Sequence, residues 1–296
     1  MKIDELLNYA LDSGASDLHL SVGSKPMVRI NGTMHPLNLD VMSKESMESI
    51  LPQVLSDEQV SKFRKEKEID FSAKMDGKGR FRVNFFSQLN GIAGVFRTIP
   101  DVIKSFEDLG IPPILKELCL KNRGLILLTG PTGSGKSTTL ATMVDHVNEN
   151  RSCHIITIED PVEYFHNSKS SLINQRELGA NTHSFSNALR AALREDPDVI
   201  LVGEMRDLET TSLSLTAAET GHLVMSTLHT SSAVKAIDRV IDIYPEGQKT
   251  QIRSMMSESL VAVIAQKLLP TKDGKGRAPA CEIMIATTAI RNLIRE

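Results

Sequence analysis

Four short apolar runs in the second half of the chain constrain its fold more than any other feature of the sequence. Each run is nearly all apolar, and stretches with helical spacing separate one run from the next. A half-exposed strand alternates polar and apolar residues, so a continuous apolar run predicts a strand that is buried on both faces. The sequence therefore predicts an α/β fold in which helices cover both faces of a parallel sheet. The runs are 125–128, 155–158, 199–202 and 223–228.

The first hundred residues predict a separate α+β domain. Asn31-Gly32 lies between two short apolar stretches, and this pair favours a hairpin because both turn residues need positive φ. The spacing predicts one helix at 2–13 and two helices within 43–67. The predicted strands are 17–22, 27–30, 33–37, 69–75, 80–86 and 92–98, with a turn at 76–79.

A proline-rich segment separates these two regions. Residues 100–113 contain three prolines and one glycine, which is typical of an interdomain linker. We therefore place an N-terminal domain at 1–99, a linker at 100–113, the core of the second domain at 114–270 and a C-terminal region at 271–296.

Charge and cysteine content argue against several function classes. The 296 residues carry a formal net charge of −3, so the chain lacks a global basic field for DNA, RNA or an anionic membrane. The three cysteines are far apart, which argues against a disulfide framework or a zinc site and favours reduced thiols in a cytoplasm. We find neither a signal peptide nor an apolar run of about 20 residues, so we expect membrane contact only through partners.

One glycine-rich segment follows the first apolar run and precedes a predicted helix at 138–147. It matches the P-loop pattern at every position, in the order strand, loop, helix that phosphate binding needs. Its glycines let backbone N–H groups turn toward phosphate, and the helix N-terminus adds partial positive charge. We expect Lys136 to reach the β and γ phosphates of ATP and Ser137 to bind Mg²⁺. The predicted ATP or ADP contacts are Gly130, Pro131, Thr132, Gly133, Ser134, Gly135, Lys136, Ser137 and Thr138.

Acidic residues follow two of the other apolar runs. In an open α/β sheet the ligand lies beyond the carboxyl ends of the strands, so these residues should face the P-loop. Glu204 is predicted to bind Mg²⁺, directly or through water. Glu159 and Glu163 compete for the role of the general base that polarises the attacking water. We favour Glu163, with Pro161 fixing the backbone between the two carboxylates, and keep Glu159 as a nucleotide-site residue.

Two histidines flank the fourth run. His229 follows the run and lies nearer the expected ligand, so we predict that it senses the γ-phosphate. His222 precedes the run, and an unbroken strand would separate it from His229 by about 23 Å. Because Gly221 before it ends the preceding helix, a packing or capping role for His222 is at least as well supported as a nucleotide contact.

Arginines alternate with apolar residues in the predicted strand 80–86. Phe81, Val83 and Phe85 share one face, while Arg82 lies on the other and Arg97 lies on the next strand. A planar, permanently charged guanidinium suits developing phosphate charge, and a solvated strand face is the alternative. Both a contact with the subunit's own nucleotide and a contact with that of a neighbour remain open.

Together these motifs resemble the secretion-superfamily P-loop ATPases, and most closely the type IV pilus retraction ATPases. By this resemblance Glu159 and Glu163 match the family's Asp box, and Glu204 its Walker B segment. His222 and His229 match its His box, and Arg82 and Arg97 match N-terminal arginines that approach nucleotide. The resemblance covers the whole chain and rests on Ser16-Asp17-Leu18-His19-Leu20, the P-loop, 158–163, 203–207, 220–223, 227–230 and 289–296.

The resemblance implies a PAS-like N-terminal domain, a RecA-like ATPase domain and assembly as a homohexameric ring. It implies a motor that hydrolyses ATP to retract pili, at the cytoplasmic face of the membrane, with an inner-membrane platform protein as partner and no direct nucleic-acid contact. Assembly and secretion relatives commonly carry a four-cysteine zinc insert, whereas this C-terminal region has Cys281 alone, which favours the retraction branch. Family members usually continue past residue 296, so we expect an incomplete C-terminal region.

Three other functions compete with this interpretation. A secretion or conjugation ATPase is the nearest alternative within the superfamily. A nucleic-acid translocase would need a basic stripe and stacking aromatics, but only 4% of residues are aromatic and none is Trp. Acidic residues at several strand ends argue against a nucleotide-binding regulator that barely hydrolyses ATP.

Overall fold

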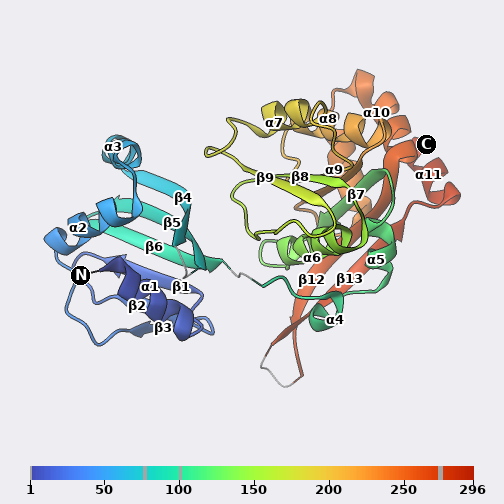
Figure 1. Ribbon diagram of the computed structural model, residues 1–296. Coiled ribbons are helices and arrows are strands. Elements are labelled where there is room, and N and C mark those ends of the chain that lie inside the picture. Colours follow the sequence, from blue (N-terminus) through green and yellow to red (C-terminus); the bar gives the residue numbers. More distant parts are fainter. Residues whose placement is uncertain (1, 76–78, 100–101, 273–275) are drawn as a thin grey trace. The chain divides into compact units, whose positions relative to one another are not determined.

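The computed structural model describes residues 2–75, 79–99, 102–272 and 276–296, which divide into two compact units (Figure 1). The first unit spans Met1–Asp101 and the second spans Val102–Glu296. An α+β unit is therefore followed by a larger α/β unit, the fold class that the sequence predicts. Among the described residues, no helix combines the length and apolar composition that a bilayer span requires.

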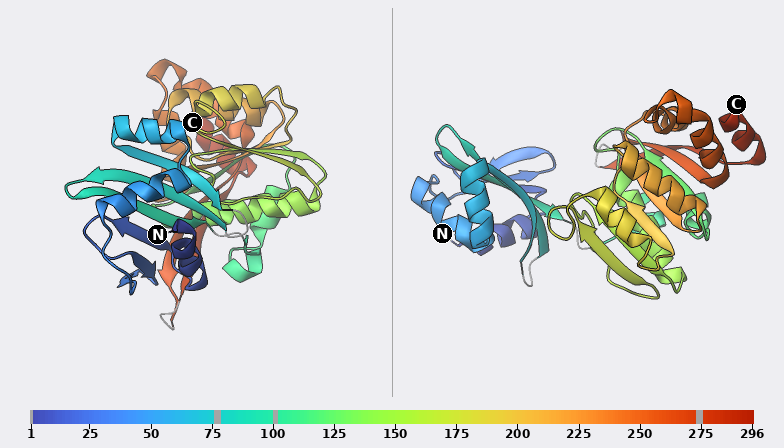
Figure 2. Two further views of the ribbon diagram at one scale, coloured as in Figure 1. Left: turned by 60° about the vertical axis from the view of Figure 1, so that its left-hand side comes forward. Right: turned by 90° about the horizontal axis from the view of Figure 1, so that it is seen from above.

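The first unit is a six-stranded antiparallel sheet with its helices packed on one face (Figures 1 and 2). Its strands run in the order β3-β2-β1-β6-β5-β4. The helices are α1 (Ile3–Asp12), α2 (Lys44–Val54) and α3 (Asp57–Glu66). The strands are β1 (Asp17–Ser21), β2 (Met27–Ile30), β3 (Thr33–Pro36), β4 (Glu68–Met75), β5 (Gly79–Gln88) and β6 (Gly91–Ile99).

Two local predictions for this unit are confirmed. Asn31 and Gly32 have φ values of 50° and 84° and connect β2 to β3, as the hairpin prediction requires. Phe81, Val83 and Phe85 of β5 are fully buried in the core beneath the helices, so the predicted alternation along this strand is real. Three of the four residues of the turn predicted at 76–79 lie outside the described residues.

The second unit contains a seven-stranded sheet in the order β13-β12-β7-β11-β10-β8-β9. Neighbouring strands from β12 to β9 pair in parallel, and β13 pairs antiparallel with β12. The strands are β7 (Gly124–Thr129), β8 (His154–Glu159), β9 (Leu172–Glu177), β10 (Val199–Val202), β11 (Leu223–Leu228), β12 (Leu260–Pro270) and β13 (Arg277–Ile285). The helices are α4 (Phe106–Leu109), α5 (Ile114–Cys119), α6 (Lys136–Asn150), α7 (Phe185–Ala192), α8 (Leu208–Glu219), α9 (Ala233–Asp242), α10 (Glu246–Ser259) and α11 (Thr288–Arg295).

Two hydrophobic cores on opposite faces of this sheet explain the continuous apolar runs. Leu125 and Leu127 of β7 belong to a core with residues of α7 to α11, whereas Ile126 and Leu128 belong to a core with residues of α4 to α6. Successive residues of a strand point to opposite faces, so most positions of a strand buried on both faces are apolar, and Thr157 and Ser226 are buried exceptions. All four predicted runs form such parallel strands, and β7 lies between β12 and β11 in the interior of the sheet.

The structure draws two boundaries differently from the predicted ones. Phe106 and Ile111, which we place in the linker, are buried in the core against α6, and the second unit begins at Val102. The proposed division at residue 270 cuts the hairpin of β12 and β13, and Ile294 beyond it is buried in the core beside α10. Most of 100–113 and all described residues of 271–296 therefore belong to the α/β unit.

Candidate nucleotide-binding site

The P-loop connects β7, an interior strand of the sheet, to the first residue of α6. Gly130, Gly133 and Gly135 have φ values of 149°, 76° and 85°, a region that other residues rarely adopt. Gly135 is the N-cap of α6, so Lys136 and Ser137 begin the helix and their N–H groups have no partner within it. The loop thus places unsatisfied donors and a helix N-terminus at the carboxyl end of β7.

Lys136 folds back over the loop that carries it. Its Nζ donates to the carbonyl oxygens of Gly130 at 2.8 Å and Pro131 at 3.1 Å. Burial lowers the pKa of Lys136, and the negative charges of Glu204 and Glu163 oppose that shift. The charges of both acidic residues that the sequence assigns to catalysis therefore act on the amine of Lys136.

The loop after β10 carries Glu204 to the same edge of the sheet. Its carboxylate lies 2.7 Å from Nε of Arg206 and 3.3 Å from Nε2 of His229, which follows β11. Thr227 of β11 donates to the carbonyl of Gly203 at 2.6 Å and holds this loop against the neighbouring strand. Glu204 and His229 are thus brought together, as expected for residues beyond adjacent strand ends.

The two candidate bases at the end of β8 have different surroundings. Glu159 accepts hydrogen bonds from Thr157 at 2.7 Å and from Gln175 at 3.4 Å. Burial raises the pKa of Glu159, although the hydrogen bond from Thr157 opposes that shift. Glu163, beyond the cis Asp160–Pro161 peptide bond, has an exposed side chain. Glu159 is therefore fixed in the protein, whereas Glu163 is accessible to solvent.

Two predicted nucleotide contacts have other partners in this structure. His222 lies at the amino end of β11, where its Nδ1 is 3.0 Å from the carbonyl oxygen of Ala217, and His229 lies at the opposite, carboxyl end. The capping alternative for His222 therefore describes the α/β unit better than a contact with the P-loop of the same unit. Thr138 Oγ1 lies 2.8 Å from the hydroxyl of Tyr164 and ties α6 to the segment that carries Glu163.

Arg82 and Arg97 lie side by side in the first unit. They are register partners in β5 and β6, on the sheet face opposite the helices. Nη2 of Arg82 lies 2.6 Å from Asp70, and Nε of Arg97 lies 2.8 Å from Asp17. Burial alone would raise the pKa of Asp17, but hydrogen bonds from Ser16 and Arg97 lower it. Each arginine is thus held by a carboxylate of its own unit.

Gln175 is a site residue that the sequence analysis misses. From β9 it donates to Glu159 and, at 2.8 Å, to the carbonyl oxygen of Tyr164, while its own carbonyl accepts the N–H of His166 at 2.8 Å. One side chain therefore holds both ends of the segment that carries Glu163. The sequence analysis did not predict β9 because its composition is polar. A long-range contact of this kind also leaves no local pattern in a sequence.

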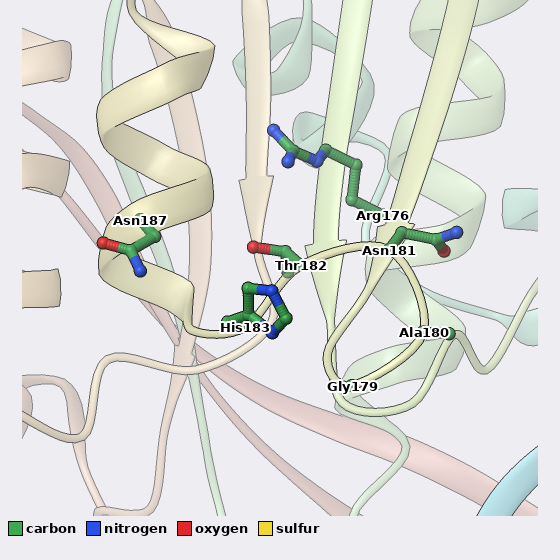
Figure 3. A pocket seen from close by; sticks show the side chains of 7 residues that line it. All are labelled: Arg176, Gly179, Ala180, Asn181, Thr182, His183 and Asn187. Atoms are coloured by element: carbon green, nitrogen blue, oxygen red, sulfur yellow. The ribbon is translucent and has the colours of Figure 1, made fainter. Parts of the chain in front are cut away.

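A polar pocket of about 340 Å³ lies beside this region, between the end of β9 and the start of α7 (Figure 3). Arg176 comes from β9 and Asn187 from the first turn of α7, with the connecting loop between them. Arg176 is also paired with Glu195 at 3.2 Å. The lining residues, Arg176, Gly179, Ala180, Asn181, Thr182, His183 and Asn187, differ from the predicted site residues.

Comparison with known proteins places this chain in a family. The family model described as type II/IV secretion system protein matches residues 1–294. The chain belongs to this family. It is 54% identical over 296 residues to the type IV pilus retraction ATPase PilT of Pseudomonas aeruginosa, covering all of this chain and 86% of that relative. It is 55% identical over 271 residues to a twitching motility protein of Neisseria gonorrhoeae, covering 92% and 72% of the two chains.

A solved structure extends the likeness to three dimensions. The crystal structure of the pilus retraction motor PilT with bound ADP aligns with a TM-score of 0.96 and 50% identity, over 100% of this chain and 86% of that one. This member of the secretion family therefore has the fold of a nucleotide-binding protein over its whole length.

Proposed function

We propose that this chain is a motor ATPase that hydrolyses ATP to drive type IV pilus retraction. The observation that carries the proposal is a complete P-loop whose lysine feels the charges of Glu204 and Glu163, in a chain similar over its whole length to PilT. In the proposed reaction the amine of Lys136 leaves the loop carbonyls and stabilises charge on the β and γ phosphates. The N–H groups of residues 133–138 bind the same phosphates.

Mg²⁺ is the metal that the donor set fits. The Ser137 hydroxyl and the Glu204 carboxylate are hard oxygen donors, and Mg²⁺ is usually held by one or two such groups together with substrate phosphates and water. When bound, the ion neutralises phosphate charge. Ser137 and Glu204 would hold it, and His229, beside Glu204, would respond to the γ-phosphate.

We assign the general base to Glu163. Burial gives Glu159 a raised pKa, which also suits a base, but hydrogen bonds from Thr157 and Gln175 occupy its carboxylate. Glu163 has an exposed side chain close enough to influence the pKa of Lys136, so it can reach a water at the γ-phosphate. Glu159 then serves as a fixed anchor for the segment.

We further propose that Arg82 and Arg97 act on the nucleotide of a neighbouring subunit in a homohexameric ring. Both belong to the first unit, and their guanidinium groups suit phosphate charge. Closing of the ring on ATP and opening after hydrolysis would couple chemistry to movement, because the nucleotide binds the closed state better. The partner would be the inner-membrane platform protein of the pilus, met at the cytoplasmic face of the membrane, without direct nucleic-acid contact.

Deletion of the gene, followed by counts of surface pili and an assay of twitching, tests the retraction function. Excess pili together with lost twitching is the expected result, because assembly continues without retraction. Loss of pili would instead assign the motor to assembly, and unchanged pili and twitching would contradict a role in pilus dynamics. Restoring the wild-type gene is the control.

A further inference from the structure

Gln266 is a buried polar residue that lies against the P-loop and takes no part in the proposed hydrolysis. It follows Ala265 of β12, which is paired in register with Thr129, the last residue of β7. The parallel pairing thus carries Gln266 to the level of Gly130, where the P-loop begins. Its exposed fraction is only 2%, so its amide must find partners within the protein.

The amide of Gln266 bonds to the loop and to the helix that follows it. Nε2 donates to the carbonyl oxygen of Ser134 at 2.7 Å, and Oε1 accepts from Oγ1 of Thr139 at 2.9 Å. A carbonyl can only accept, so the Ser134 contact fixes which end of the amide faces the loop. Sγ of Cys281, the register partner of Gln266 on β13, lies 3.8 Å from the same Oε1.

Two glycines show how closely the loop packs on Gln266. A Cβ added to Gly130 would lie 2.3 Å from the backbone oxygen of Gln266, and a Cβ added to Gly135 would lie 2.9 Å from its Nε2. Real Cβ atoms do not approach other atoms so closely, so both positions require glycine for contact with β12 as well as for their backbone angles. The conformation of the P-loop is therefore fitted to this residue.

The hydrogen bond from Gln266 to the Ser134 carbonyl also sets the direction of the Gly135 N–H, which belongs to the same peptide group. In a trans peptide the C=O and the following N–H point in opposite directions. Because the Ser134 carbonyl points at Gln266, the N–H of Gly135 points away from β12. Gly135 is the N-cap of α6, where P-loop N–H groups bind phosphate.

We propose that Gln266 is a positioning residue for nucleotide binding, which holds the Ser134–Gly135 peptide with its N–H directed at the phosphates. Without this contact the peptide can rotate, and the loop must be ordered again each time nucleotide binds. The free-energy cost of ordering the loop then makes the binding free energy of the phosphates less favourable. Gln266 itself touches no nucleotide and acts through the loop.

The test is a titration of the full chain with ADP, which reports binding without hydrolysis. Gln266→Met keeps the side-chain volume and removes both hydrogen bonds. It should raise the Kd for ADP about tenfold. Gln266→Glu keeps an acceptor for Thr139 and loses the donor to Ser134, so it should weaken ADP binding at least as much. This second variant tests the proposal if Gln266→Met does not fold.

Thr139→Val is the matched control, because it breaks the bond to α6 and leaves the bond to Ser134. Its Kd for ADP should change less than about twofold, and its Tm should fall by no more than that of Gln266→Met, because it loses one of the two hydrogen bonds. Wild-type affinity in folded Gln266→Met or Gln266→Glu would overturn the proposal. Equal weakening of ADP binding in Thr139→Val would overturn it too, since a general loss of packing would then explain the effect.

Discussion

At the scale of single residues, contacts rather than residue types separate the acidic candidates. The sequence predicts Glu159, Glu163 and Glu204 near the P-loop, because parallel strands end at one edge of a sheet. Hydrogen-bond partners distinguish the three glutamates. One example is Gln175, which donates to the carboxylate of Glu159 from a distant segment and leaves no local pattern in the sequence. Residue roles that depend on such partners could not be predicted from spacing alone.

Glu163→Gln should keep nucleotide affinity and lose turnover. The substitution preserves size and removes only the proton acceptor, which in general base catalysis contributes about 10²–10⁴ in rate. Phosphate release and ADP titration on the same preparation measure the two quantities, with Glu159→Gln as the comparison. A wild-type rate in Glu163→Gln would move the base to Glu159 or Glu204.

Glu159→Gln should gain stability relative to the wild type as the pH rises. Burial raises the pKa of Glu159 in the folded chain above its ordinary value of 4.5. A carboxyl group of this kind favours the folded state below the unfolded pKa, and that contribution is lost as the pH rises through the folded pKa. The variant lacks this loss, so its Tm minus that of the wild type should be larger at pH 7 than at pH 5. A difference that stays constant or shrinks would refute the raised pKa.

At the scale of elements, alternation and turn signals predicted the strands of the first unit, and continuous apolar runs predicted four strands of the second unit. The four buried runs became β7, β8, β10 and β11 because both faces of each strand meet a core. In contrast, β9 is polar and lacks that signal, whereas β12 was missed although its first six residues, 260–265, are all apolar, because they follow α10 with no break in the chain. The placement of β12 beside the P-loop follows from sheet pairing, which spacing does not encode.

Arg291, in the C-terminal motif 289–296, has a structural role: it fixes α11 against the end of α10. Its guanidinium donates to the carbonyl oxygens of Ala286, Ser257, Glu258 and Leu260, and so joins α11 to the end of α10. Arg291→Ala should lower the free energy of unfolding by about 2 kcal/mol, because charged donors to several carbonyls are lost together.

Arg295→Ala is the matched control for Arg291→Ala. Arg295 lies one turn later and bonds only the Ser257 hydroxyl and the Glu258 carboxylate among its described contacts, so its loss should cost less than about 1 kcal/mol. Urea unfolding of both variants gives the comparison. An Arg291→Ala protein as stable as Arg295→Ala would exclude this structural role.

At the scale of the whole molecule, the account requires residues from two subunits at one nucleotide. Mixed rings of Lys136→Ala and Arg97→Ala subunits should recover activity wherever an intact P-loop meets an intact Arg97. Such an arginine contributes about 10³–10⁵ in rate in related phosphoryl transfer. Asp17→Asn, which releases Arg97 without removing it, should keep most activity. Co-assembled mixtures no more active than the separate variants would rule out action in trans.

The rate of ATP hydrolysis by folded Lys136→Ala protein tests the central claim most directly. Lys136 is the P-loop cation on which the charges of Glu204 and Glu163 act, and its removal takes away charge that stabilises the transferred phosphate. Steady-state phosphate release should fall at least about a hundredfold while the circular dichroism spectrum stays that of the wild type. Wild-type phosphate release from a well-folded Lys136→Ala chain would contradict the assignment of this site as the ATPase centre.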